Sequence, residues 1–503
     1  MKKIFILFIA LLGITTMKAQ DITDAYRYSA EELTGTARFR AMSGAFSALG
    51  GDISAMSLNP ASSAVFLNSF ATVSFDFRNS RNDVNYFNGL TSSKDDNFDL
   101  NQAGAALVFN AQNNSDWRKF AIGINYGTTK NYDDSFLASG TGNNSIDNYF
   151  LGYADGVPLD LLQTRDNESV ADLYSYLGQN EGFGAQQAML GYQAYIIDPT
   201  NPDDPQNDTY TSTIAPGSFS QDYSSISTGL NGKFTFNFAT QYQDFLYLGA
   251  NLNIHSISYD SSTLYTENNS NSGSETNEVR FRNDLSTNGD GFSFQIGAIA
   301  KINEMLRLGA SYESPTWYNI NEESSQSLES YSQQFDDQTV VNPNVLNVYP
   351  EYTLQTPGKL TGGLAVLFGD KGLLSFDYSY KDYSQMEFRP VNDPEFGYQN
   401  DQIKNAMRAA STYRVGGEYR FGAVSVRGGY RFEESPFENT TTIGDLTGYS
   451  AGLGYNFGAL KLDVAYTNAQ YDENRALYQV GLTDTANMNR ELSSVVVSLS
   501  FGL

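Results

Sequence analysis

Fourteen segments of the chain alternate an apolar side chain with a small or polar one, and their spacing is the strongest constraint on the fold. A period of two predicts β-strands with one apolar face. Between consecutive segments, the odd-numbered gaps hold at least 17 residues and the even-numbered gaps at most 9. Such sorting is typical of membrane barrels, which have long loops at one end, short turns at the other and an even strand number. The segments span 72–78, 105–110, 120–126, 230–238, 246–255, 292–302, 306–312, 359–368, 373–380, 413–421, 424–431, 449–457, 460–467 and 495–503.

A soluble sandwich would show the same alternation, but it has no reason to sort its loops by length. In hydrocarbon every backbone polar group must be paired within the protein, and a closed barrel achieves this without a free edge. We therefore predict an all-β fold, a 14-stranded antiparallel transmembrane β-barrel over residues 71–503 with long extracellular loops. Both termini are then expected on the periplasmic side, where the short turns lie.

The composition excludes several other classes of protein. Charged residues make up 17% of the 503-residue chain, below the roughly 25% usual for soluble domains. A formal net charge of −26 argues against a nucleic-acid partner. The absence of cysteine removes disulfide scaffolds, cysteine-based zinc sites and thiol nucleophiles.

The first 20 residues have the pattern of a signal peptide. Lys2 and Lys3 precede an apolar run over 4–14, and Ala19 and Gln20 end the expected cleavage region. The alternative is a retained anchor helix, although the run is short for a membrane span. We predict a signal peptide over residues 1–20 and an outer-membrane location for the mature chain.

Residues 21–70 lack strand alternation and carry two motifs, Gly-Ala-Phe-Ser-Ala-Leu-Gly over 44–50 and Asn59-Pro60-Ala61. The second is also an ordinary turn sequence. Fourteen strands enclose more space than wall side chains fill, so we expect this segment inside the barrel as a plug. The two motifs resemble the hatch of the FadL/TodX family of outer-membrane transporters for hydrophobic compounds.

This resemblance implies a mechanism. Outer loops would capture a hydrophobic, long-chain fatty-acid-like substrate and pass it to a pocket bounded by the plug. The substrate would leave sideways through a gap in the barrel wall, and Asn59, Pro60 and Ala61 would be plug residues. In the family the gap is a kink in the third strand, which here contains Gly123 and is followed by Gly127.

The inward faces of the predicted strands carry ten basic and four acidic residues. One interpretation is a field that attracts an anionic head group. The other is internal pairing of these cations, because buried charges are usually paired; plug acids such as Glu31 and Glu32 are candidate partners. The candidate head-group partners are Arg307, Lys359, Arg414, Arg420 and Arg427.

The longest gap, residues 127–229, carries apolar clusters that form either a capture surface above the barrel or a small core of their own. Within it, residues 198–208 are rich in oxygen ligands that suit calcium, but three prolines favour a solvated turn. The candidate ligands would be Asp198, Asp203, Asp204 and Asp208. Residues 400–410 have helix composition and are expected to form a lid piece or an ordinary loop helix.

We predict a passive importer of small hydrophobic or amphipathic molecules, with no enzyme activity and no cofactor. Hydrophobic small molecules, lipids and lipopolysaccharide are the expected partners. One alternative is a non-transporting barrel subunit of a larger secretion or assembly complex, with its outer loops as docking surfaces for protein partners. Another is a lipid-acting barrel enzyme that uses the single histidine, His255, which otherwise is a polar residue facing the lumen.

Overall fold

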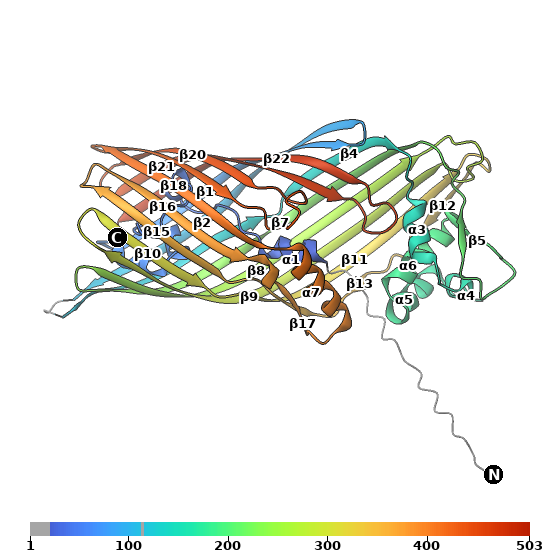
Figure 1. Ribbon diagram of the computed structural model, residues 1–503, viewed down its shortest axis with the longest axis horizontal. Coiled ribbons are helices and arrows are strands. Elements are labelled where there is room, and N and C mark those ends of the chain that lie inside the picture. Colours follow the sequence, from blue (N-terminus) through green and yellow to red (C-terminus); the bar gives the residue numbers. More distant parts are fainter. Residues whose placement is uncertain (1–20, 112–114, 503) are drawn as a thin grey trace, which may run out of the picture.

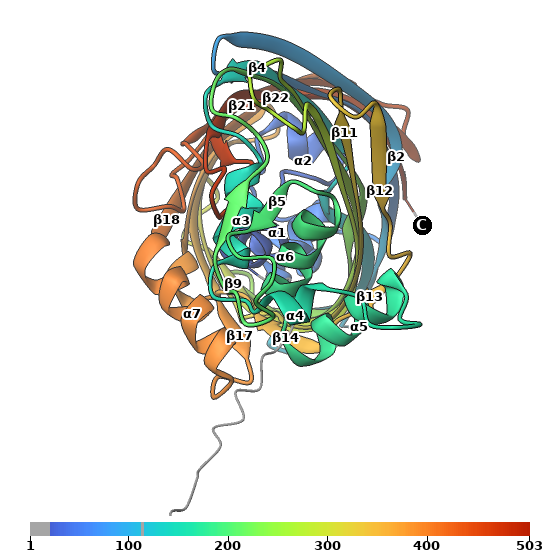
Figure 2. The ribbon, with the colours of Figure 1, turned by 90° about the vertical axis from the view of Figure 1, so that its right-hand side faces the viewer.

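The computed structural model describes residues 21–502 except 112–114, so the predicted signal peptide lies outside the described residues. Fourteen antiparallel strands form a closed barrel in which β22 pairs with β1 (Figures 1 and 2). The predicted fold class is confirmed. The barrel strands are β1 Phe70–Tyr86, β2 Gly89–Asn110, β3 Trp117–Asn131, β7 Phe219–Tyr242, β8 Leu246–Asn268, β9 Glu278–Lys301, β10 Leu306–Glu313, β15 Lys359–Phe368, β16 Gly372–Asp382, β18 Ala409–Phe421, β19 Val424–Glu433, β20 Leu446–Asn456, β21 Leu460–Ala476 and β22 Thr485–Gly502.

Shorter strands extend the wall at the long-loop end of the barrel. They are β4 Asp134–Gly142, β11 Trp317–Ser332, β12 Asp337–Val341, β13 Asn347–Val348, β14 Tyr352–Gln355 and β17 Glu387–Arg389. A separate two-stranded sheet holds β5 Ile197–Pro199 and β6 Tyr210–Ser212.

Many strands run far beyond their predicted ends. The expected 26-residue gap between the first two strands is wrong: β1 and β2 pair up to Tyr86 and Gly89, which leaves a turn of residues 87–88. In β8 the reason is visible, because the apolar face changes sides. Leu252 and Ile254 point outward, whereas further along Ile257 and Tyr259 are buried inside and the outward positions are polar. The outward apolar residues form a band that suits lipid, and the wall beyond it stands in water.

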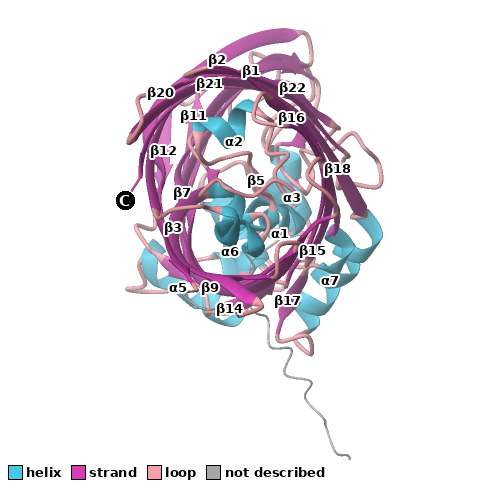
Figure 3. Ribbon diagram, turned by 90° about the vertical axis from the view of Figure 1, so that its left-hand side faces the viewer, coloured by secondary structure: helices cyan, strands magenta, loops and turns pink. Residues whose placement is uncertain are grey.

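The amino-terminal segment lies inside the ring of strands (Figure 3). It contains α1 Ile22–Ser29, α2 Ala37–Ala41 and two 3₁₀ turns, η1 Ser54–Ser57 and η2 Pro60–Val65. Asp21 and Asp24 form a capping box at the start of α1, and the Asn59 side chain caps η2 at the amide of Ala61. The segment is therefore a plug held by ordinary helix-capping chemistry.

The long-loop mouth is filled by four helices, α3 Asp147–Ala154, α4 Leu159–Leu162, α5 Val170–Asn180 and α6 Phe183–Gln193 (Figure 2). Phe150, Leu177 and Leu190 are fully buried in an apolar cluster that also includes Phe281 and Leu328 of the wall. Apolar side chains of the 127–229 segment thus form a small core that is shared with the wall. We call α3–α6 with β5 and β6 the cap.

Residues 394–406 form the last helix, α7 Pro394–Ala406, beside the 3₁₀ turn η3 Tyr383–Gln385. The helix predicted over 400–410 therefore starts earlier and ends sooner, because 409–421 belong to β18. Ile403 of α7 shares a buried cluster with Ala25 and Tyr28 of α1. Within the described residues no helix has the length and apolar character needed to span a membrane.

Candidate functional site

The Asn59 side chain bonds both within the plug and to the barrel wall. Its side-chain amide donates to the carbonyl oxygens of Ser47 at 2.7 Å and Ala298 at 3.0 Å, and lies 3.4 Å from that of Ala310. Its oxygen accepts from the Ala61 amide at 3.1 Å. Asn59, Pro60 and Ala61 are all buried in this contact, so the motif joins the plug to β9 and β10.

Glycine lets the two backbones approach here. A Cβ added at Gly297 of β9 would lie 2.1 Å from the Asn59 side-chain oxygen, and one at Gly249 of β8 would lie 2.4 Å from the Pro60 carbonyl carbon. Neither distance is possible for a real side chain. The wall therefore requires glycine where the motif docks.

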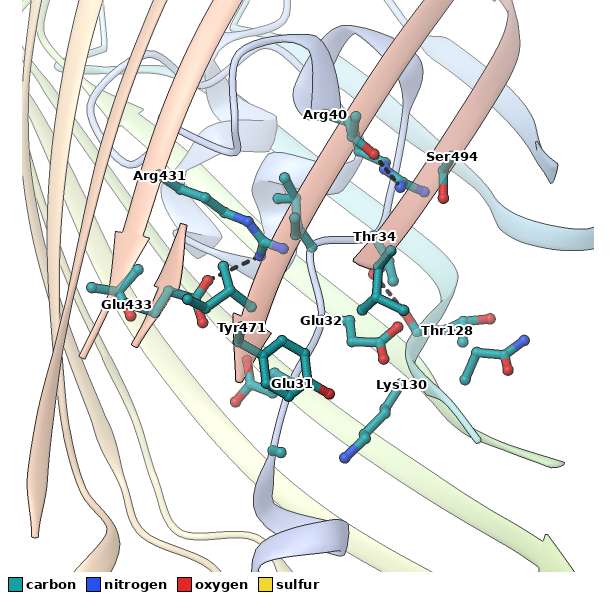
Figure 4. A pocket seen from close by; sticks show the side chains of 18 of the residues that line it. Glu31, Glu32, Thr34, Arg40, Thr128, Lys130, Arg431, Glu433, Tyr471 and Ser494 are labelled. Atoms are coloured by element: carbon teal, nitrogen blue, oxygen red, sulfur yellow. Dashed lines mark hydrogen bonds and ion pairs between the residues drawn. The ribbon is translucent and has the colours of Figure 1, made fainter. Parts of the chain in front are cut away.

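An open chamber lies in the lumen beside the plug (Figure 4). Tyr26, Glu31, Glu32 and Thr34 of the plug segment line it. Counting the plug residues, seven basic and six acidic side chains line the chamber. Apolar side chains such as Leu230, Ile443 and Leu492 lie beside them, so the lining is mixed. The charged lining residues are Glu31, Glu32, Arg40, Asp76, Arg78, Asp99, Lys130, Lys359, Lys381, Arg414, Arg431, Glu433 and Glu434.

Three of the five predicted head-group cations have carboxylate partners. Lys359 pairs with Glu31 of the plug at 2.6 Å and with Glu313 at 3.0 Å. Glu418 accepts from Arg427 at 2.7 Å and from Arg420, and Asp463 also pairs with Arg427, at 2.6 Å. Internal pairing thus occupies these three.

Glu31 is the centre of the lysine side of this network. Besides Lys359, Lys381 contacts its carboxylate at 3.1 Å. Burial alone would raise the pKa of Glu31, but the two lysines outweigh it and hold that pKa well below its usual range.

The two other predicted cations differ. Arg307 donates to the Leu49 carbonyl at 3.0 Å and so contacts the plug backbone. Arg414 lines the chamber, and among the described residues it has no carboxylate within 4.0 Å and its buried Nε has no hydrogen-bond partner. Its neighbour across the ladder, Asp377, accepts instead from the Phe46 and Ser47 amides, both at 2.8 Å.

The wall has a seam between β2 and β3. The two strands pair from Asn110 and Lys119 to Gln102 and Gly127, and in the described chain no ladder pair joins β2 to β3 or β4 beyond Gly127. Side chains cross the seam instead: Asn131 donates to Asp99 at 2.9 Å. Asn97 donates to Asp133 at the same distance.

The plug also lies against this seam. The Glu32 amide donates to the Thr129 carbonyl of β3 at 2.8 Å, while the Asn101 amide of β2 donates to the Gly35 carbonyl at 2.6 Å. Asp99, Asn101, Thr128, Lys130 and Asn131 line the chamber, so the seam forms part of its wall.

The two predicted gap glycines occupy different positions relative to the seam. Gly123 is paired on both sides, with Ala106 and Asn237, and a Cβ there would lie 2.7 Å from the Met56 sulfur of the plug. Gly127 is the last β3 residue paired with β2. Their part in a lateral exit stays a prediction.

The remaining candidates have local partners. His255 Nε2 lies 3.0 Å from Ser293 Oγ, and Nδ1 lies 3.2 Å from the Tyr318 hydroxyl. It is 4% exposed. Asp203, Asp204 and Asp208 are exposed and Asp198 belongs to β5. Across the described ranges no group of three or more acidic or histidine residues is placed to hold a metal ion.

Sequence reasoning counted Arg431 among the ten inward cations but not among the head-group candidates, and it did not identify Lys130 or Asp99. Arg431 has the inward parity of β19, which is a usable signal. Lys130 and Asp99 lie beyond the predicted ends of their strands, where the alternation of apolar residues stops.

Comparison with known proteins agrees with this architecture. The chain resembles a Pseudomonas aeruginosa FadL homologue, with a TM-score of 0.54 at 12% identity over 94% of this chain and 99% of that one. It also resembles the P. putida toluene transporter TodX, with a TM-score of 0.53 at 14% identity over 94% and 99%. At these identities the likeness shows the fold alone. A search of curated proteins finds no match.

A family description provides the remaining comparison. Residues 207–501, more than half of the chain, match the family described as outer membrane protein transport protein (OMPP1/FadL/TodX). This confirms the resemblance seen in the plug motifs. Members of that family are transport channels for hydrophobic compounds rather than enzymes, and they reside in the outer membrane. The chain belongs to the OMPP1/FadL/TodX family of outer-membrane transport proteins.

Proposed function

We propose that this protein imports amphipathic small molecules passively across the outer membrane and releases them sideways through the β2–β3 seam. The observation that supports this most is the chamber, which is bounded by the plug and by the side chains that bridge the seam. Outside the seam, Phe77, Phe98 and Leu100 are 51%, 59% and 44% exposed. An amphiphile in the chamber would thus have an apolar surface beside its exit.

The orientation is part of the same proposal. The short turns and the carboxyl end of β22 would face the periplasm, as in other outer-membrane barrels. Asp21, the first described residue, lies against Gln479 of the β21–β22 loop at the long-loop end. The plug runs through the lumen from the long-loop end to the start of β1. We therefore place only the carboxyl terminus on the periplasmic side.

The buried cap core favours capture at the rim of the cap rather than on a broad greasy surface. Tyr176 and Tyr195 remain 40% and 63% exposed there, whereas Phe150 and Leu190 are fully buried. Material from outside would then have to pass the cap before reaching the chamber. The sequence shows no energy-coupling motif, and passive diffusion of the substrate down its concentration gradient needs none.

A disulfide across the seam tests lateral release. The chain has no cysteine, so Asp99→Cys with Asn131→Cys introduces its only thiols. They replace side chains whose tips are 2.9 Å apart, and because cysteine is shorter the two strands must approach further for the sulfurs to bond. We expect oxidation to reduce uptake of labelled oleate and labelled lysophosphatidic acid by cells, and reduction to restore it.

The matched control places cysteines at Leu107 and Ile122, which face each other in the intact part of the same β2–β3 ladder. Oxidation there should leave uptake unchanged. Equal uptake by the oxidised and reduced seam variants would contradict lateral release at this seam.

A further inference from the structure

The chamber has an unexpected lining for a family that moves hydrophobic compounds. Besides its thirteen charged residues it presents neutral hydroxyl side chains on several elements, among them Thr128, Thr412 and Ser494. Burying a hydrocarbon against such groups removes their water without replacing its hydrogen bonds, which is costly. The lining therefore disfavours a wholly apolar ligand and suits one that carries a polar group.

Two arginines on neighbouring strands give this lining its strongest feature. Arg414 of β18 and Arg431 of β19 are direct partners in the ladder, and both line the chamber. Like charges directly opposite each other destabilise a sheet. A third arginine, Arg40 of α2, reaches the same chamber, where Figure 4 shows it across from Arg431.

The available acids leave part of this charge uncompensated. Arg40 pairs with Asp76 at 2.5 Å, and Arg431 donates through one nitrogen to Glu433 at 2.9 Å. Arg414 has no ion pair within 4.0 Å among the described residues, and its ladder neighbour Asp377, which bonds plug amides, balances its charge only from a distance. A bound oxyanion would supply the missing counter-charge and accept from free guanidinium donors.

The position of the arginines relative to the seam suggests how an amphiphile would lie. Between β3 and β18 the barrel order has six strands, and between β19 and β2 it has four, so the arginines face the seam across the lumen. A head group held at the arginines leaves the seam side for a tail. The exposed Phe98 and Leu100 continue that path toward lipid.

Taken with the proposed function, on which this inference rests, we propose that the chamber is a head-group site. It binds a large polar head that carries an oxyanion and several hydroxyl groups, with the oxyanion at Arg414 and Arg431. The apolar tail of the amphiphile lies in the seam. The cargo class is thus an anionic lipid with a polyhydroxylated head rather than a hydrocarbon.

Binding to the purified protein in lipid nanodiscs tests the head-group site without any transport. The probes are myo-inositol 1-phosphate, neutral myo-inositol, hexanoate and toluene, followed by calorimetry. We expect the phosphate to bind, and the other three to bind at least about tenfold more weakly, since each lacks the charge or the hydroxyl groups. Tighter binding of toluene or hexanoate than of the phosphate would overturn the proposal.

Matched arginine variants locate the oxyanion. Arg414→Gln and Arg431→Gln should each weaken binding of myo-inositol 1-phosphate by about tenfold, with Arg414→Lys in between. Arg420→Gln is the control, because Arg420 pairs with Glu418 and does not line the chamber. Heat-modifiable migration on gels confirms that each variant is folded. Unchanged affinity in the Arg414→Gln and Arg431→Gln variants would contradict the assignment.

The source of the head group is decided with lysophosphatidylinositol, which adds one tail to the same head. Tighter binding than that of the free phosphate supports a lipid, and the seam disulfide of Asp99→Cys with Asn131→Cys should remove the gain. Equal or weaker binding overturns the placement of a tail in the seam and leaves a soluble phosphate as the ligand. Failure of the oleate uptake test would not change these affinities, so the two proposals can fail separately.

Discussion

Replacing Asn59 by alanine should loosen the plug locally while leaving the barrel intact. The variant loses the hydrogen bonds to the Ser47 and Ala298 carbonyls and the cap on the Ala61 amide. Three buried hydrogen bonds at about 1 kcal/mol each give about 3 kcal/mol, or about 100-fold in an opening equilibrium. Hydrogen exchange measured by mass spectrometry in detergent should therefore be about 100-fold faster over residues 44–62 and unchanged in β8 and β9.

Two further variants sharpen this measurement. Asn59→Asp keeps the shape but turns the donor into an acceptor that faces carbonyl oxygens, so it should open the plug at least as much. Asn439→Ala removes an asparagine from the β19–β20 loop, where it bonds only its own turn, and should change nothing in the plug. Exchange at the wild-type rate over 44–62 in both Asn59 variants would refute the idea that this side chain holds the plug.

Three more outcomes follow from the same structure. Gly297→Ala puts a Cβ against the Asn59 side chain and should also speed exchange in the plug, whereas Gly362→Ala, with nothing within 4 Å of its Cβ, should not. Leu190→Ala cuts a fully buried side chain from the cap core and should destabilise the cap by about 2–5 kcal/mol, seen as faster proteolysis within 145–218 with no change in gel heat-modifiability. Glu267 lies far beyond the apolar band and accepts hydrogen bonds from the Ser145 hydroxyl and the Ile146 amide. Burial raises the pKa of its carboxyl in the folded state. The stability that protonated Glu267 gives the cap is therefore complete below about pH 4.5 and is lost as the pH rises through the folded-state pKa. Near-ultraviolet circular dichroism of the tyrosine-rich cap should show a lower melting temperature at pH 8 than at pH 4.5, and Glu267→Gln should flatten the difference.

The strands that cross lipid were predictable because hydrocarbon imposes one rule on every outward position. Where the wall leaves lipid that rule ends, and in β8 the apolar face moves inward at Ile257 to pack beneath α1. Apolar and polar residues still alternate there, but the apolar ones now face the lumen and not the lipid. This is why the predicted strands stop near 255 and why the β1–β2 hairpin was expected to be a loop.

The candidate site was predictable in composition but not in pairing. Lys359 and Arg414 both occupy lumen-facing positions in the alternating pattern of their strands, so the sequence identifies the two equally well. Their fates differ because Glu31 lies 328 residues away in the chain from Lys359, and because the plug, rather than Arg414, occupies Asp377. Such choices depend on register and on long-range contacts, which a single sequence does not reveal.

The hydrogen bonds from the plug to Asp377 couple the position of the plug to the charge around Arg414. As long as the Phe46 and Ser47 amides engage that carboxylate, the guanidinium opposite it stays attractive to a visiting anion. If the plug withdrew, the carboxylate would become the nearest counter-ion, and the visitor would be displaced by a competitor built into the wall. Discharge of cargo would then follow the movement of a short stretch of plug backbone.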